Sequence, residues 1–118
     1  MRLLLPMVKG LIVSFFLVSF WLFVPSAWAD QGSSSAALFD VHCAGCHPNG
    51  ANIIRRGKSL KQRALKRHGY GSAEAIATLI TNGKGLMSAY GDQLTEQEIR
   101  SLANYVVEQA EIDWRGDQ

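Results

Sequence analysis

The sequence predicts an all-α fold of three or four helices, and two observations support this prediction. Apolar residues recur at helical spacing, most clearly at Ile99, Leu102, Ala103, Val106 and Ala110. No segment alternates between apolar and polar residues for long enough to indicate a β-strand. Since the chain has 118 residues, we expect these helices to form one small domain.

The first 29 residues have the pattern of a secretory signal peptide. Arg2 and Lys9 supply a basic start, an apolar run covers residues 11–24, and Ala27-Trp28-Ala29 offers small residues at the two positions that a signal peptidase reads. An uncleaved membrane anchor is the alternative, but the run is shorter than the roughly 20 apolar residues of a spanning helix. We expect cleavage after Ala29, which removes residues 1–29 and leaves a mature domain over residues 30–118.

Capping and turn residues divide the mature domain into helices. Ser34 or Ser35 can cap a first helix that runs through Phe39 towards Cys43, and the loop Pro48-Asn49-Gly50 follows it. A short basic helix comes after Gly57 and Lys58 and ends at Gly69-Tyr70-Gly71. Its apolar side consists of Leu60, Ala64 and Leu65.

The second half of the domain has clearer boundaries. Ser72 is placed to cap a third helix, which Asn82 and Gly83 end, and residues 83–91 form a loop. Thr95 and Glu98 have the spacing of a capping box at the start of the final helix. The flanking hydrophobic staple positions of this box hold Leu94 and Ile99.

The sequence Cys43-Ala44-Gly45-Cys46-His47 is a C-x-x-C-H haem attachment motif. Each thiol can add across one haem vinyl group, and the adjacent histidine supplies the proximal nitrogen to iron. A disulfide within the motif would close a very small loop and stabilise little. A thioredoxin-type pair needs a βαβ context, and a zinc site needs four ligands, for which only His42 and His68 remain without zinc-finger spacing. We therefore expect one covalent haem c.

Met87 is the candidate for the second axial ligand. It is the one methionine of the mature domain, because Met1 and Met7 belong to the predicted signal peptide. It lies in a glycine-flanked loop between two helices, where a thioether can reach the open face of a haem. The alternatives are a buried core methionine at this position, or His68 as the ligand. His68 ends a basic helix and is expected to be solvated, and His42 is expected at the surface.

Ligation of one iron by His47 and Met87 fills both axial positions. No open site is then left for oxygen or peroxide, and the thioether sulfur favours ferrous iron and raises the potential. Such a centre transfers single electrons and has no small-molecule substrate, so the sequence predicts a carrier and not an enzyme.

Charge is unevenly distributed over the mature domain, which has ten basic and ten acidic residues once Arg2 and Lys9 are removed. Between Asp40 and Glu74 there is no acidic residue, whereas the stretch from Asp92 onward is mostly acidic. The resulting dipole could orient the molecule towards a charged partner. The alternative is that these charges lie on ordinary solvated helix faces. The basic residues are Arg55, Arg56, Lys58, Lys61, Arg63, Lys66 and Arg67.

From Leu38 to Trp114 the chain resembles the class I cytochromes c, and within them the cytochrome c6 group of oxygenic phototrophs. The resemblance covers nearly all of the mature domain in one order. The matching pieces are Leu38-Phe39, Cys43 to His47, Asn52-Ile53-Ile54, Lys58-Ser59-Leu60, Ala64-Leu65, Asn82-Gly83-Lys84, Met87, Ala103-Asn104-Tyr105-Val106 and Trp114.

The resemblance implies a small cytochrome c fold whose first and last helices cross, with Phe39 and Tyr105 packed at the crossing. It implies that Asn52 and Lys58 lie near the haem propionates. It also implies a soluble, monomeric carrier in the thylakoid lumen or periplasm, which accepts electrons from cytochrome b6f and donates them to photosystem I or a terminal oxidase. Membrane contact would occur only through these partners, and no nucleic acid is involved.

Three positions depart from the pattern of the group. Ser35 replaces an expected glycine at the helix crossing, and Ser88 follows Met87 where a proline is usual. Leu79 occupies the place where the photosynthetic donors resemble one another in having a glutamine, and a leucine cannot donate a hydrogen bond to the haem environment. These departures are more similar to c6-like paralogues than to the main donor. A haem-based sensor in which Met87 dissociates is the alternative function, and a peroxidase is disfavoured because no distal acid–base residue is evident.

Overall fold

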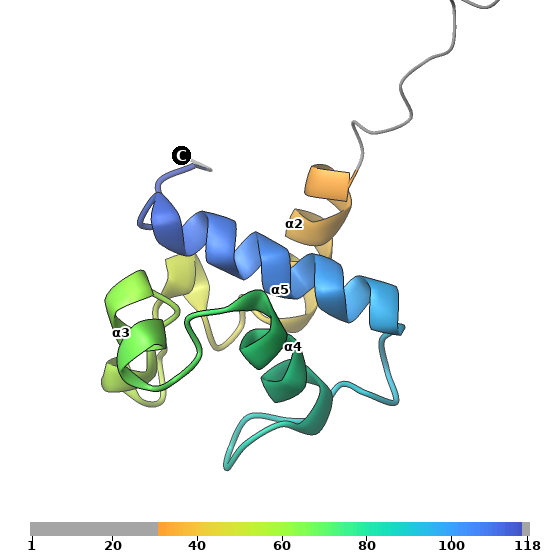
Figure 1. Ribbon diagram of the computed structural model, residues 1–118, viewed down its shortest axis with the longest axis horizontal. Coiled ribbons are helices and arrows are strands. Elements are labelled where there is room, and N and C mark those ends of the chain that lie inside the picture. Colours follow the sequence, from red (N-terminus) through yellow and green to blue (C-terminus); the bar gives the residue numbers. More distant parts are fainter. Residues whose placement is uncertain (1–30, 117–118) are drawn as a thin grey trace, which may run out of the picture.

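The computed structural model describes residues 31–116, with side chains from Ser35 onward. This part of the chain has four α-helices and two short 3-10 turns, and no strand is formed in it (Figure 1). The all-α prediction is therefore confirmed, while the predicted signal peptide lies outside the described residues. The elements are α2 (Gln31–His42), η1 (Pro48–Gly50), η2 (Arg56–Lys58), α3 (Gln62–Arg67), α4 (Ala73–Asn82) and α5 (Glu96–Glu111).

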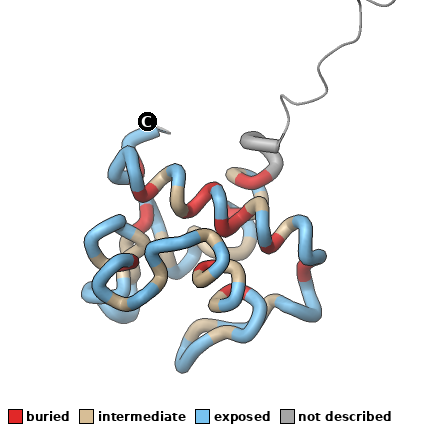
Figure 2. Tube along the Cα trace, viewed as in Figure 1, coloured by how far each residue is buried: buried red, intermediate tan, exposed pale blue. Residues whose placement is uncertain are grey.

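Helix α5 is the centre of the fold, because α2, α3, α4 and η1 all contact it (Figure 1). Its apolar stripe is buried as the spacing predicts, and Leu102 and Ala103 have no exposed surface. Figure 2 shows the buried positions recurring along α5 on the side that faces the other helices. Within residues 31–116, no helix is both long and apolar enough to cross a membrane.

An aromatic cluster joins α2 to α5, as the resemblance implied. The ring centroids of Phe39 and Tyr105 are 5.5 Å apart at an interplanar angle of 52°. Trp114, beyond the end of α5, completes the cluster at 5.0 Å from Phe39 and 6.1 Å from Tyr105. Such tilted pairs contribute about 0.5–1.5 kcal/mol each beyond the area that they bury. Ser35 is also buried, one helical turn before Phe39, so a small polar side chain is accommodated there.

The predicted caps of α4 and α5 are confirmed. Ser72 Oγ accepts a hydrogen bond from the Ala75 amide at 3.3 Å. In the capping box, the Glu98 amide donates to Thr95 Oγ1 at 3.2 Å and the Thr95 amide donates to Glu98 Oε2 at 2.7 Å. Leu94 and Ile99 are both buried, as staple positions require.

Two predicted boundaries were wrong. Helix α2 already includes Gln31, so Ser34 and Ser35 lie inside it and do not cap it. Helix α3 begins at Gln62, and Leu60 therefore precedes it in an extended segment. Leu60 still packs against the core, because its amide donates to the Gly50 carbonyl at 2.7 Å and holds the segment there.

Trp114 anchors this extended segment from the other side. Its indole nitrogen donates to the Leu60 carbonyl at 3.1 Å, across 54 positions of sequence. Because Leu60 is in turn bonded to Gly50, the end of α5 is tied to the turn that follows His47. The C-terminal aromatic residue thus helps to fix the backbone around the attachment motif.

Candidate haem site

The attachment motif forms a tight turn directly after α2. The amides of Cys43 and Ala44 both donate to the Phe39 carbonyl, at 2.8 and 2.9 Å, so the turn continues the helix. The amides of Cys46 and His47 then donate to the Cys43 carbonyl, at 3.1 and 2.9 Å. The two cysteines are therefore held at the two ends of a single turn whose shape is fixed by the backbone.

Both cysteines are free thiols, with Cys43 half-buried and Cys46 exposed. Burial, together with the charge of the neighbouring Cys46, raises the pKa of Cys43 to about 11. A thioredoxin-type pair needs a lowered thiol pKa, so this environment does not support that alternative. The described part of the chain has no cluster of three or more His, Cys, Asp or Glu residues placed to hold a metal ion by themselves.

His47 is oriented by its ring nitrogen Nδ1, which lies 2.9 Å from the Ala51 carbonyl oxygen. A carbonyl can only accept, so Nδ1 carries the proton and Nε2 retains its lone pair. This arrangement is typical of metal-binding histidines, in which the second nitrogen fixes the tautomer and the ring direction. His47 is therefore preset to offer Nε2 as a ligand.

Met87 lies in a short, internally bonded turn between α4 and α5. The Lys84 amide donates to the Met87 carbonyl at 3.0 Å and the Met87 amide donates to the Lys84 carbonyl at 3.1 Å. The chain then returns along the end of α4, where the Tyr90 amide donates to the Ile80 carbonyl at 2.9 Å. Met87 is half-buried and packs against the edge of the core, so it is not the fully buried core methionine of the alternative reading.

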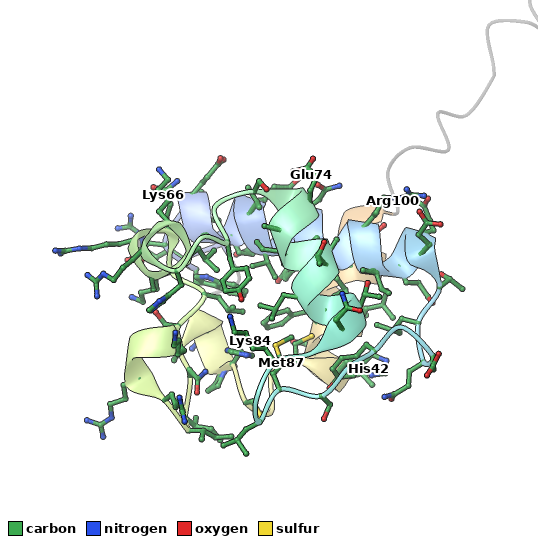
Figure 3. All side chains as sticks on the ribbon, turned by 60° about the horizontal axis from the view of Figure 1, so that its bottom comes forward. His42, Lys66, Glu74, Lys84, Met87 and Arg100 are labelled. Carbon is green, nitrogen blue, oxygen red and sulfur yellow. The ribbon has the colours of Figure 1, made fainter. Side chains whose placement is uncertain are left out.

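In Figure 3 the sulfur atoms gather beside Met87, with Lys84 to one side and His42 to the other. Cys43 and Met87 both pack against the same core, and Tyr90, three residues after Met87, is close enough to Cys43 and Cys46 to be influenced by their charge. The tertiary structure thus brings the methionine loop and the attachment motif to one side of the molecule.

Tyr90 was not singled out by the sequence reasoning. Its hydroxyl donates to the His42 carbonyl at 2.9 Å, and its ring stands edge-on to the His42 imidazole at 5.8 Å. Burial raises the pKa of the phenol, and the two cysteines raise it further. His42 is half-buried by this contact, so the expectation of a surface histidine was wrong. The position of an aromatic residue soon after Met87 is the only sequence signal that could have indicated this role.

Asn52 organises the loop that follows the motif. Its Oδ1 accepts from the amides of Ile54 and Arg55 at 3.0 and 2.7 Å, and its Nδ2 donates to the Lys58 carbonyl at 3.2 Å. The structure therefore brings Asn52 and Lys58 together through the backbone of this loop. Their predicted closeness to the haem propionates stays a prediction.

His68 is engaged within the protein. Its Nε2 lies 3.0 Å from the Gly57 carbonyl oxygen and its Nδ1 lies 3.2 Å from Lys58 Nζ. A neutral ring with the proton on Nε2 satisfies both contacts. Both contacts are exposed, as expected of a solvated histidine, and both ring nitrogens are already used, which disfavours His68 further as an axial ligand.

Large apolar side chains are exposed in the same two segments that carry the ligand candidates. Ile53 and Ile54, which follow the His47 turn, are 64% and 55% exposed, and Leu86, next to Met87, is 73% exposed. A flat apolar group between the motif and the loop is what would cover such side chains. Together with the free thiols, the oriented His47 and the loop methionine, these residues fit a haem.

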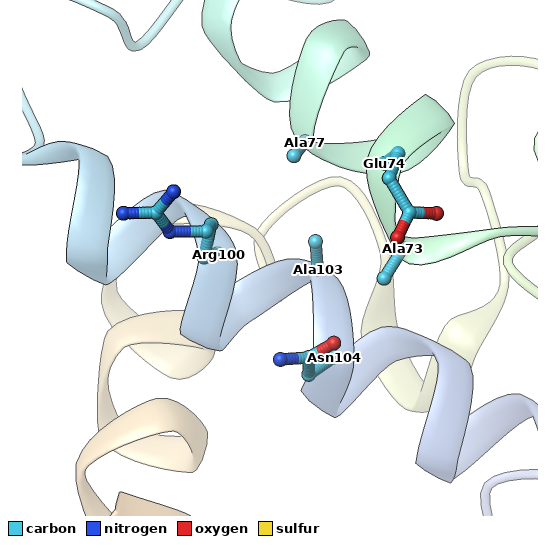
Figure 4. A pocket seen from close by; sticks show the side chains of 6 residues that line it. All are labelled: Ala73, Glu74, Ala77, Arg100, Ala103 and Asn104. Carbon is cyan, nitrogen blue, oxygen red and sulfur yellow. The ribbon is translucent and has the colours of Figure 1, made fainter.

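A hollow of about 80 Å³ lies between α4 and α5, away from the motif (Figure 4). Its lining contains no cysteine, histidine or methionine, and three of its six residues are alanines. It therefore holds none of the residue types expected to attach or ligate the haem. Its lining residues are Ala73, Glu74, Ala77, Arg100, Ala103 and Asn104.

A helical fold with an attachment motif at the end of its first helix and a methionine loop before its last helix is that of the class I c-type cytochromes. The family model described as "Cytochrome C oxidase, cbb3-type, subunit III" matches residues 30–106. A cytochrome c6-like protein of Nostoc sp. is 53% identical over 108 residues, which are 91% of this chain and 96% of the relative. A cytochrome c6 of Aphanizomenon flos-aquae is 45% identical over 82 residues, which are 70% of this chain and 94% of the relative.

Solved structures agree with these relatives. Cytochrome c6C from Synechococcus sp. PCC 7002 is 57% identical with a TM-score of 0.67, over 69% of this chain and 99% of its own. Cytochrome c6B from Synechococcus sp. WH8102 is 51% identical with a TM-score of 0.66, over 73% and 94% of the two chains. The chain belongs to the cytochrome c6 and c6-like family. It is thus a haem-containing protein of electron transport.

Proposed function

We propose that one haem is bound covalently through Cys43 and Cys46, with His47 and Met87 as its axial ligands, and that the protein carries single electrons between redox complexes. When bound, the haem supplies an iron that alternates between its ferric and ferrous states. The observation that carries the proposal is the orientation of His47, whose Nδ1 is bonded to the Ala51 carbonyl at 2.9 Å and whose Nε2 is left free. The turn around Met87 supports the second ligand, because its backbone is fixed at both ends.

Reaction of the ferrous holoprotein with carbon monoxide tests this proposal. Met87 should exclude the gas, so binding at neutral pH should be slow and incomplete, whereas Met87→Ala should bind it rapidly. The variant is the matched control, because it retains His47 and both cysteines. Rapid and complete binding by the unaltered protein would count against the carrier and favour a sensor in which Met87 dissociates.

The partners we propose are cytochrome b6f as donor, with photosystem I or a terminal oxidase as acceptor. The relatives named cytochrome c6 support this choice. The greater identity to proteins named cytochrome c6-like, c6C and c6B favours a second candidate, a c6-like carrier that serves an acceptor other than photosystem I. Electron-transfer rates of the reduced protein with isolated photosystem I and with oxidase distinguish the two.

We further propose that the carrier is soluble, monomeric and exported to the thylakoid lumen or periplasm after cleavage behind Ala29. The basic start, the short apolar run and the Ala27-Trp28-Ala29 sequence support an exported protein. The mass of the holoprotein purified from cells tests this directly. A chain that begins at Asp30 is expected, and a chain that retains residues 1–29 would indicate a membrane anchor.

The basic surface of the molecule is the proposed docking region for an acidic partner. We define it as the seven cationic residues between Ile54 and His68, all of which are exposed. Lys61 differs from the others, because its Nζ pairs with Asp113 at 3.3 Å. The remaining charges are available to orient an encounter. The basic surface consists of Arg55, Arg56, Lys58, Lys61, Arg63, Lys66 and Arg67.

A further inference from the structure

The loop that carries Met87 is fastened to the end of α2 by one side-chain hydrogen bond. The Tyr90 hydroxyl donates to the His42 carbonyl at 2.9 Å, and the two residues are 48 positions apart in sequence. His42 is the last residue of α2, and the carbonyls of a final helical turn have no partner within the helix. The phenol therefore satisfies a helix-end carbonyl while it links two distant segments.

The two ends of this bond are adjacent to the proposed ligands. Tyr90 is three residues after Met87, and His42 directly precedes Cys43. A movement of the loop away from the attachment motif must therefore break this bond. Because the ring also rests edge-on against the His42 imidazole at 5.8 Å, the contact consists of a bond and a packed surface.

The backbone of Tyr90 is itself fixed, so the hydroxyl is held by a rigid support. The Tyr90 amide donates to the Ile80 carbonyl at 2.9 Å, and its own carbonyl accepts from the amides of Gln93 and Leu94 at 3.0 and 2.9 Å. These bonds connect the residue to the end of α4 and to the segment that begins α5.

The part of the loop that precedes Met87 is held by a weaker side-chain contact. Lys84 Nζ donates to the Tyr70 hydroxyl at 3.1 Å and lies 5.6 Å from the centre of the Tyr70 ring, but this contact is exposed. Ser88, directly after Met87, also leaves the backbone freer than a proline would. The half-buried bond of Tyr90 is thus the stronger of the two side-chain links that restrain the loop.

We propose that Tyr90 is a positioning residue for Met87, whose hydroxyl holds the ligand loop against the haem-binding segment and so limits how often Met87 leaves the iron. The inference rests on the proposed ligation of iron by Met87. Tyr90 acts through the loop and through His42, and it does not itself ligate iron.

Displacement of Met87 by imidazole in the ferric holoprotein tests this inference. Imidazole binds only when Met87 has dissociated, so its apparent affinity is proportional to the open fraction. Tyr90→Phe keeps the ring and removes the hydroxyl. It should raise the apparent affinity for imidazole about three- to tenfold, the range that corresponds to the loss of one neutral hydrogen bond.

Tyr70→Phe is the matched control, since it removes a hydroxyl from the exposed link to the part of the loop that precedes Met87. It should change the affinity less than about twofold, because exposed contacts to a lysine contribute little. An equal rise in both variants would overturn the assignment to Tyr90. So would a Tyr90→Phe protein that unfolds more easily in denaturant but binds imidazole with unchanged affinity, because that result describes a purely structural role.

Ferric iron with a thioether ligand has a weak charge-transfer band in the red. This band tests the ligation of iron by Met87 separately from the role of Tyr90. If the unaltered protein lacks this band, the proposed ligation by Met87 fails, and with it the basis of the inference. If the band is present and imidazole binds both proteins equally, only the role of Tyr90 is refuted.

Discussion

Substitution of Gly50 by alanine should be among the most destabilising single changes outside the ligands. Gly50 is buried in the turn after His47 and has φ +71°, in the left-handed region that side chains other than that of glycine rarely adopt. A Cβ built on Gly50 would overlap the Trp114 indole at Nε1, Cδ1 and Cε2. The substitution therefore combines backbone strain with a collision.

The size of the stability loss in Gly50→Ala depends on how tightly the Trp114 indole is packed. Trp114 packs on Phe39 at 5.0 Å and on Tyr105 at 6.1 Å, so it cannot move away without disturbing the crossing of α2 and α5. The left-handed backbone costs about 1–2 kcal/mol for alanine. Overpacking costs about 1–3 kcal/mol. Loss of the bond from Trp114 Nε1 to the Leu60 carbonyl costs about 0.5–1.5 kcal/mol. We expect a total of about 2.5–6.5 kcal/mol, a large part of the stability of a small domain.

Two glycines provide controls that separate the contributions. Gly69 has φ +81° and no atom within 4 Å of an added Cβ. Gly69→Ala should therefore destabilise the protein only by the cost of a left-handed backbone conformation, about 1–2 kcal/mol. Gly57 has neither feature, and Gly57→Ala should stay within about 0.5 kcal/mol of the unaltered protein. Free energies of unfolding from guanidinium titration of the three holoproteins test this order. A loss for Gly50→Ala no larger than that for Gly69→Ala would refute the role of the Trp114 contact.

Three further predictions concern potential, docking and pH. Leu79→Gln should raise the midpoint potential in a redox titration, because the amide can donate a hydrogen bond near the haem that leucine cannot, and an unchanged potential would refute this reasoning. Reversing three cations of the basic surface should slow electron transfer to an acidic partner at low salt and flatten its salt dependence, and unchanged stopped-flow rates would show that the surface is only solvated. Because Lys61 is paired, the choice is Arg63, Lys66 and Arg67. Hydrogen bonds from the backbone and side chain of Thr95 lower the pKa of Glu98 in the folded protein below its ordinary value of 4.5. The ionised Glu98 carboxylate therefore stabilises the fold above pH 4.5, and this stabilisation is lost as the pH falls through the lower folded-state pKa. The difference in unfolding free energy from Glu98→Gln should therefore shrink on acidification, and a difference independent of pH would argue against the capping carboxylate.

Local sequence signals determined most of the secondary structure. The capping box at Thr95, the cap at Ser72 and the spacing of apolar residues along α5 act between residues a few positions apart, so they can be read from the chain directly. The start of α2 was misplaced because serine is a good cap but is also tolerated inside a helix that packing stabilises. Leu60 was assigned to a helix because its apolar side chain was interpreted as part of a helical stripe, whereas an apolar residue of the segment before the helix can pack against the core equally well.

The candidate ligands were also determined by the sequence alone. The attachment motif is contained in five consecutive residues, and Met87 is the one methionine beyond the predicted signal peptide. Their chemistry is a property of residue type and spacing, which no folding information is needed to recognise. The tautomer of His47, in contrast, depends on where the Ala51 carbonyl lies.

Only the tertiary structure decided how these ligands are held. The bond from Tyr90 to His42 spans 48 positions and that from Trp114 to Leu60 spans 54, and nothing in the chain indicates the carbonyl partner of either side chain. The burial of His42 was misjudged for the same reason, since its partner Tyr90 comes from a segment that is distant in sequence. Long-range contacts form only when the helices pack, so the residues that position the candidate site are decided by the fold, even though the candidate ligands themselves are evident in the sequence.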